Sequence, residues 1–183
     1  MNHTLIVFIV ISIPMVIVSW HPLQNINSHG FYRFFGWEGI AWLFAVNYHF
    51  WFKNPFGLQQ LISWFLLGLA AYLVIAGYLV MRNAGKPSEE RKDKELFHFE
   101  KTTHLIDHGV FKYIRHPLYA SLVYLTWGLL LKNITMPLLL IAVAATVFMY
   151  ITTLFEEKES IKYFGEKYKT YMKKTRRFIP FIL

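Results

Sequence analysis

The sequence contains no cysteine among its 183 residues. This absence excludes disulfide bonds, thiolate metal sites and a cysteine nucleophile. Acidic residues are also few: 11 Asp and Glu stand against 19 Lys and Arg, so the formal net charge is +8. Ten of these acids lie in segments 82–116 and 156–183, each of which also carries eight basic residues. The rest of the chain is nearly uncharged, which indicates a membrane protein with basic loops rather than a nucleic-acid-binding protein.

Hydrophobic residues make up 55% of the chain and aromatic residues 19%. Five apolar runs approach or exceed the length of a helix that crosses a bilayer, namely residues 4–20, 37–52, 58–81, 117–131 and 136–155. The sequence therefore predicts an all-α integral membrane protein with about five transmembrane helices. The last two runs should form a helical hairpin, followed by an amphipathic cytosolic tail with apolar residues at helical spacing. Within this single membrane domain, we expect residues 1–81 to supply N-terminal transmembrane helices and residues 82–183 to form the functional core.

The distribution of basic residues predicts the orientation of these helices. If five spans alternate across the bilayer, both basic segments and Arg33 fall on one side, whereas Lys53 and Lys132 fall on the other. Cytoplasmic loops carry an excess of Lys and Arg. We therefore expect a multi-pass protein, in the cell membrane if its source is prokaryotic, with the N-terminus outside and the C-terminus in the cytosol.

Residues 104–119 read HLIDHGVFKYIRHPLY and connect the longest polar segment to an apolar run. Pro117 suits the first turn of a helix, because its missing N–H would lack a partner there in any case. Arg115 and His116 therefore lie at a helix N-terminus at the membrane edge. Free N–H groups and the positive end of the helix dipole gather at such a place, which suits a carboxylate or another anionic group.

Two blocks of the sequence carry a family resemblance. The pattern H-L-I-x-x-G-x-F-x-x-x-R-H-P-x-Y at 104–119 resembles the signature of the isoprenylcysteine carboxyl methyltransferase and phospholipid N-methyltransferase superfamily. The second block consists of Glu156 and Glu157, the run FGEKY at 164–168, Tyr171, and Arg177 before Pro180. The blocks occur in the expected order, separated by a hairpin of the expected size. Members of this superfamily are integral-membrane enzymes that use S-adenosylmethionine.

The resemblance implies an S-adenosylmethionine site in the cytosol, where the two blocks meet beside the hairpin. Carried over residue by residue, it implies cofactor contacts at Thr103, His104, Leu105, Ile106, Phe111, His116, Pro117, Tyr119 and Glu156. Arg115 and Glu156 are the expected catalytic residues, with Arg115 either at the reacting end or acting as a structural clamp. Phe111 stands where the family more often has Tyr, so one hydroxyl contact is lost. A carboxylate can accept hydrogen bonds from the ribose hydroxyls or the ammonium group, and aromatic rings can face the sulfonium.

One departure from the family concerns the methyl acceptor. In prenylcysteine carboxyl methyltransferases, an Arg one helical turn before the cofactor-binding Glu serves the substrate carboxylate, and here that position is Thr152. The departure argues against a prenylated protein and leaves a lipid headgroup amine, a small thiol or an isoprenoid-like acceptor open. We expect lipids and a lipophilic or small-molecule acceptor as partners, with no nucleic acid and no metal. A lipophilic acceptor is predicted to enter from the bilayer near Tyr119, Val123, Thr152 and Phe155.

Three alternatives fit parts of the sequence. His104 and His108 have the i,i+4 spacing of a helical metal-ligand pair, and His98 and His116 lie nearby, which is compatible with a metal enzyme. A non-catalytic membrane protein would use the same residues in salt bridges and in contacts of a basic tail with anionic lipid. An NADPH-binding reductase of the related membrane superfamily is the third alternative.

Overall fold

The computed structural model describes residues 2–84 and 104–180. Within these ranges every named element is a helix, and the one β-type contact is an isolated bridge between Ile114 and Arg176. The predicted all-α class is therefore confirmed for the described part of the chain. The α-helices are α1 (Asn2–Ser19), α2 (His29–Asn47), α3 (Leu58–Ala84), α4 (Pro117–Leu130), α5 (Met136–Phe164) and α6 (Glu166–Lys174). Short 3-10 helices occur at Pro22–Gln24, Tyr48–Phe50 and Gly109–Lys112.

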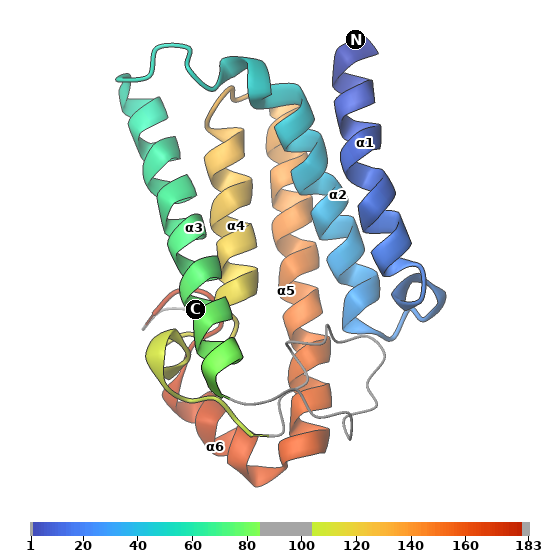
Figure 1. The fold of residues 1–183 in the computed structure, drawn as a ribbon, viewed down its shortest axis with the longest axis vertical. Coiled ribbons are helices and arrows are strands. Elements are labelled where there is room, and N and C mark those ends of the chain that lie inside the picture. Colours follow the sequence, from blue (N-terminus) through green and yellow to red (C-terminus); the bar gives the residue numbers. More distant parts are fainter. Residues whose placement is uncertain (1, 85–103, 181–183) are drawn as a thin grey trace.

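The first five helices stand side by side as a bundle, and α6 lies across its lower end (Figure 1). The largest interfaces pair α3 with α4 and α2 with α5. Along the second interface, the rings of Tyr32 and Phe155 stack with centroids 4.9 Å apart, and those of Phe35 and Phe148 stack at 5.4 Å. The division into residues 1–81 and 82–183 stays a prediction.

The limits predicted for the second helix, 37–52, are wrong. The helix begins at His29, where the Ser28 hydroxyl accepts a hydrogen bond from the backbone N–H of Phe31 at 3.1 Å. A Ser at this position satisfies one of the free N–H groups of the first turn. The helix ends at Asn47, and residues 48–50 form a 3-10 turn. The first two turns of the helix contain polar residues, so they were not part of the apolar run from which the helix was predicted.

In the described part of the chain, two helices are long and apolar enough to cross a membrane, Leu58–Asn83 within α3 and Met136–Phe164. The apolar helices α1 and α4 are shorter, and α2 carries Arg33 and Glu38. Large apolar side chains are exposed along the outer faces of α1 and α3, among them Ile17 and Phe65 at 69% and 70%. These faces suit a lipid environment, while the count of five transmembrane helices remains a prediction.

Lys132, in the turn between α4 and α5, is 3% exposed. Its Nζ lies 3.4 Å from the centroid of the Trp64 ring and 3.1 Å from Oε1 of Gln60. Gln60 in turn donates to the backbone carbonyl of Lys132 at 3.1 Å. Lys132 therefore connects α3 to the α4–α5 turn through cation–π and hydrogen-bond contacts. It is not a free surface charge on the upper end of the bundle.

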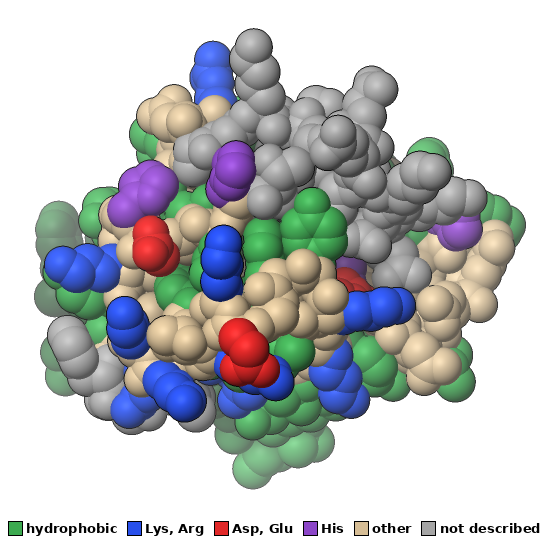
Figure 2. Space-filling view, turned by 90° about the horizontal axis from the view of Figure 1, so that it is seen from below, with side chains coloured by type: hydrophobic (Ala, Val, Ile, Leu, Met, Phe, Trp, Pro, Cys, Tyr) green, Lys and Arg blue, Asp and Glu red, His purple; other side chains and the backbone are tan. Residues whose placement is uncertain are grey.

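The lower end of the bundle carries the polar half of α5 and all of α6. The predicted apolar run ended at 155, but α5 continues to Phe164, where Gly165 with φ +61° terminates it. A positive φ is easily adopted by Gly, so the predicted interruption at Gly165 is confirmed. Figure 2 shows Lys and Arg side chains spread over this end, with few acidic ones.

Candidate active site

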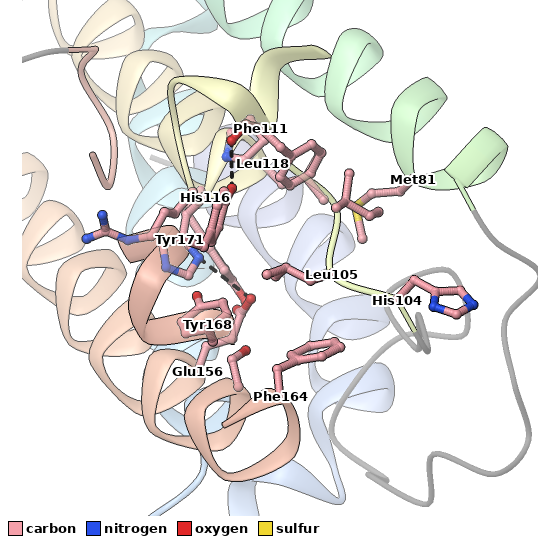
Figure 3. Close-up of a pocket in the computed structure, with 15 residues that line it drawn as sticks. Met81, His104, Leu105, Phe111, His116, Leu118, Glu156, Phe164, Tyr168 and Tyr171 are labelled. Atoms are coloured by element: carbon pink, nitrogen blue, oxygen red, sulfur yellow. Dashed lines mark hydrogen bonds and ion pairs between the residues drawn. The ribbon is translucent and has the colours of Figure 1, made fainter. Parts of the chain in front are cut away.

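A pocket opens at the lower end of the bundle, where the end of α3, segment 104–111, the start of α4, the end of α5 and α6 meet (Figure 3). Its unoccupied space amounts to about 700 Å³, including a part open to solvent. The pocket is lined by Met81, His104, Leu105, Ile106, Phe111, Arg115, His116, Pro117, Leu118, Tyr119, Glu156, Ser160, Phe164, Tyr168 and Tyr171. Residues far apart in the sequence thus form one concave surface.

Most residues expected at the site line this pocket. They are His104, Leu105, Ile106, Phe111, Arg115, His116, Pro117, Tyr119 and Glu156. Thr103 lies outside the described residues. His104 is exposed and lies at the rim, with its ring directed away from Glu156 (Figure 3). The structure therefore brings both sequence blocks to one place, and their roles in binding and catalysis remain proposals.

The segment before α4 is shaped by Gly109 and Pro117. Gly109 has φ +60°, and a Cβ at this position would lie 2.7 Å from Val80 of α3. A side chain would be disfavoured there by both the backbone conformation and the close contact. Pro117 is the first residue of α4, as predicted, and places His116 at the N-cap. The backbone carbonyl of His116 accepts the first helical hydrogen bond, from Ala120 at 2.8 Å.

His116 is held between two carboxylates of α5. Its Nδ1 lies 3.6 Å from Oε1 of Glu156, and its Nε2 lies 3.4 Å from Oε1 of Glu157. Burial alone would lower the pKa of His116, but the hydrogen bonds and charges of both carboxylates outweigh it and raise this pKa above 6.5. The carboxylates on both sides therefore favour the charged form of the imidazole, in which both ring nitrogens carry an N–H donor.

Arg115 makes the contacts of a structural clamp. Its Nε donates to Oε1 of Glu157 at 2.9 Å. Its Nη1 donates to the backbone carbonyls of Met172, at 3.1 Å, and Thr175. These carbonyls belong to the C-terminal end of α6, where a cation is favoured by the helix dipole. Of the two roles expected for Arg115, its geometry therefore favours the clamp.

Several pocket residues had no individual role in the sequence prediction. Phe164, Tyr168 and Tyr171 come from the second sequence block, and Ser160 lies on α5 between its two parts; all four line the pocket. The Tyr171 hydroxyl donates to the backbone carbonyl of Phe111 at 2.7 Å, which ties α6 to the segment before α4. Burial raises the pKa of both tyrosines, so their hydroxyls stay protonated. The helical spacing of Phe164, Tyr168 and Tyr171 in the predicted amphipathic tail could have indicated that they share one face.

Glu157 belongs to the second sequence block, but only its neighbour Glu156 was predicted to be a site residue. Glu157 is 4% exposed and binds Arg177 through two contacts, Nη2 to Oε2 at 2.7 Å and Nε to Oε1 at 3.1 Å. Together with its contacts to Arg115 and His116, it forms the centre of a buried ionic network. Glu156 faces the pocket beside it.

The opening predicted near Tyr119, Val123, Thr152 and Phe155 is wrong in its position on α5. Thr152 is fully buried and donates to the backbone carbonyl of Phe148, while Phe155 stacks on Tyr32 of α2. An apolar groove does exist beside Val123, but it follows another face of α5. It is lined by Val123, Tyr124, Trp127, Thr146, Val147, Tyr150, Phe178 and Ile179.

The described residues include no group of three or more His, Cys, Asp or Glu placed to hold a metal ion. His104 and His108 are both exposed, and they lie in a turn before the 3-10 helix rather than on one helical face. His98 lies outside the described ranges. The i,i+4 spacing therefore does not produce a helical ligand pair here.

Comparison with known proteins adds a family relationship. A family model described as phospholipid methyltransferase matches residues 58–167, more than half of the chain. A methanethiol S-methyltransferase from Crocosphaera subtropica is 23% identical over 192 residues, covering 99% of this chain and 61% of that protein. One from Pseudomonas deceptionensis is 32% identical over 71 residues, covering 39% and 26%. The chain thus spans less than two thirds of these relatives. No solved structure matches it at a comparable level.

Proposed function

The chain belongs to the phospholipid methyltransferase family, within the superfamily indicated by both sequence blocks, and from this premise we propose that it is an S-adenosylmethionine-dependent membrane methyltransferase acting on a small thiol. The observation that carries the proposal is the pocket in which His116 and Glu156 face one another among aromatic side chains. The family and the relatives support methyl transfer, while cofactor and acceptor are our inference.

The donor set of the pocket suits S-adenosylmethionine. Glu156, with a side chain 25% exposed, presents a carboxylate to the ammonium or ribose hydroxyls. The Nδ1 of His116 lies 3.6 Å from Oε1 of Glu156, so His116 orients the carboxylate that faces the ligand. Phe111, Phe164 and Tyr168 supply aromatic faces for the adenine ring and the sulfonium. The residues present therefore match the charged, polar and flat parts of this cofactor.

When bound, the cofactor supplies an electrophilic methyl group. The chain's own residues contribute alignment, since fixing two reactants in place can supply about 7–11 kcal/mol of a barrier. Apolar residues such as Leu105, Ile106 and Leu118 exclude water from the reacting end. The carboxylates beside His116 raise its pKa, which favours a role as a hydrogen-bond donor over one as a general base.

The identity of the acceptor is inferred from the relatives and from Thr152. The relatives are named methanethiol S-methyltransferases, which are enzymes for a small thiol. Thr152 is uncharged, fully buried and bonded to its own helix, so it offers no cation for an acceptor carboxylate. A thiol needs no such cation, because an apolar wall suffices to hold an alkyl group. A small thiol is therefore preferred over a carboxylate-bearing acceptor.

The cofactor assignment is tested by the binding of S-adenosylhomocysteine to purified protein in detergent, measured by calorimetry. Replacing Glu156 by Gln should weaken binding about tenfold or more, because a hydrogen bond to a charged group is lost. Glu38→Gln is the control, since Glu38 lies in α2 and accepts a hydrogen bond from Ser12 of α1 at 2.6 Å. Wild-type protein that does not bind the ligand would overturn the assignment.

The acceptor assignment is tested with cofactor carrying a labelled methyl group. Methanethiol and longer alkanethiols, phosphatidylethanolamine and S-farnesylcysteine are offered in parallel, and the labelled products are separated. A labelled thioether from the small thiol is the expected result. Labelling of the lipid amine alone would replace the thiol by a phospholipid acceptor, and labelling of the farnesylcysteine carboxyl would contradict the argument from Thr152.

A further inference from the structure

The C-terminal strap, residues 175–178, lies against the segment that begins α4. The backbone N–H of Arg176 donates to the backbone carbonyl of Tyr113 at 3.1 Å. The backbone N–H of Arg115 donates to the carbonyl of Arg176 at 2.7 Å. The N–H of His116 donates to the carbonyl of Arg177 at 3.2 Å. The strap thus satisfies N–H groups just before the helix, where an intrahelical partner does not exist. Phe178, 4% exposed, anchors it in the core.

We propose that Glu157 is a positioning residue through which the C-terminal strap fixes the orientation of His116 in the pocket. This inference rests on the proposed function, because it concerns the geometry of the same site. It assigns a role to Glu157 and Arg177, neither of which lines the pocket. Both act through His116, which does line it.

Both oxygens of Glu157 are occupied. Oε1 accepts from Arg115 at 2.9 Å and from Arg177 at 3.1 Å, and it lies 3.4 Å from His116. Oε2 accepts from Nη2 of Arg177 at 2.7 Å. Two guanidinium groups in fixed planes therefore determine where this carboxylate lies. A buried carboxylate without these two cations would be strongly unfavourable. Both guanidinium groups are therefore required to keep Glu157 charged in the interior.

The fixed carboxylate in turn fixes the imidazole. With Nε2 directed to Glu157, the opposite nitrogen Nδ1 is directed to Glu156 on the pocket wall. The groups that face His116 are Glu156 and Glu157 of α5 and the ring of Tyr119, whose centroid lies 5.9 Å from that of the imidazole. An imidazole can rotate about its side-chain bonds. The contact of Nε2 with Glu157 removes that freedom. The strap is thereby connected to the pocket by an unbroken chain of contacts.

The first test measures the pKa of His116 directly, by NMR of protein labelled at histidine, with His116→Gln used to assign the signal. Glu157→Gln should lower this pKa by about one unit or more, because one of two neighbouring charges is removed. Glu159→Gln is the matched control, two residues along α5, where the carboxylate lies 2.8 Å from Nδ1 of His29. An unchanged pKa in Glu157→Gln, or an equal fall in both variants, would overturn the proposal. This measurement needs no ligand, so it stands even if the proposed function fails.

The second test asks whether the strap acts through His116 and uses S-adenosylhomocysteine as the probe. Arg177→Gln keeps both Glu157 and Arg115, and it should weaken binding about tenfold. In a His116→Gln background the same substitution should have little further effect, because the residue it positions is gone. Equal effects of Arg177→Gln in both backgrounds would show that the strap contributes general stability and would overturn the positioning role. The affinity of Arg177→Lys should lie between those of the wild type and Arg177→Gln, since Lys keeps the charge but cannot make the two-point contact.

Discussion

His116 makes the stability of the protein depend on pH. Its pKa is raised in the folded protein, because both carboxylates outweigh the effect of burial. A group with a raised folded pKa contributes full stability below its unfolded value, near 6.5, and loses that contribution as the pH rises through the folded value. We therefore expect the unfolding temperature of the wild type to fall as the pH rises above 6.5.

The measurement is thermal unfolding followed by tryptophan fluorescence at several pH values from 6 upward. His116→Gln should lower the unfolding temperature at pH 6 and should show a shallower fall as the pH rises. The difference between the two proteins isolates His116 from other titrating groups, such as His29. Parallel curves for the two proteins would show that His116 does not titrate between folded and unfolded states.

At the residue scale, the presence of His116 and Glu156 in one pocket could be predicted from the sequence because both belong to the family motifs, while their roles stay a prediction. The separation of Glu156 from Glu157 could not. Neighbouring residues on a helix point in directions about 100° apart, so one lies on the pocket wall and the other lies inside the network. Which is which depends on how α5 is rotated against α4, and this is decided by packing.

At the scale of the elements, the interface of α3 and α4 depends on close approach at Gly128. A Cβ there would lie 2.8 Å and 2.9 Å from side-chain carbons of Leu67 and 3.3 Å from its backbone nitrogen. Gly128→Ala should therefore destabilise the protein by about 1–3 kcal/mol through overpacking. Thermal unfolding in detergent measures this effect.

Gly68, on α3, is the matched control, because a Cβ there meets nothing within 4 Å. Gly68→Ala should leave stability unchanged or raise it by up to about 1 kcal/mol, since Ala favours the helix. Small residues that allow backbones to approach are common between membrane helices. If the two substitutions behave alike, the close approach at Gly128 does not stabilise the bundle.

Helix limits were predictable where they depend on local chemistry. Pro117 begins α4 as predicted, and Gly165, predicted to interrupt the tail, ends α5, although the apolar run itself was expected to stop at residue 155. The start of α2 was not predictable from hydropathy, because His29 finds its partner, Glu159, 130 residues away. A polar residue that looks like part of a loop can be helical when a distant side chain satisfies it.

At the scale of the whole molecule, the two ends of the bundle differ in charge. The lower end carries the basic residues of α6 and the strap. On the upper end, Lys132 is buried against Trp64, so Lys53 is the exposed cation of the loops described there. The burial of Lys132 strengthens the predicted asymmetry, and we expect the lower end in the cytosol.

The absence of cysteine allows this orientation to be tested with single introduced thiols. Phe56→Cys, in the loop between α2 and α3 at 85% exposure, should react with an impermeant thiol reagent added to intact cells. Thr170→Cys, exposed on α6, should react only after the cells are opened. Wild-type protein controls for background labelling. The opposite pattern would invert the topology.

The length of α5 gives the protein a mechanical property. With 29 residues, the helix is about 44 Å long, which exceeds the roughly 30 Å hydrocarbon core of a bilayer. Glu156 and Glu157 lie on the same helix as the apolar residues that we expect to meet the lipid. A thinner bilayer tilts such a helix, and its projecting end then swings relative to the neighbouring helix that carries His116. We therefore expect the geometry of the pocket to depend on the thickness of the membrane.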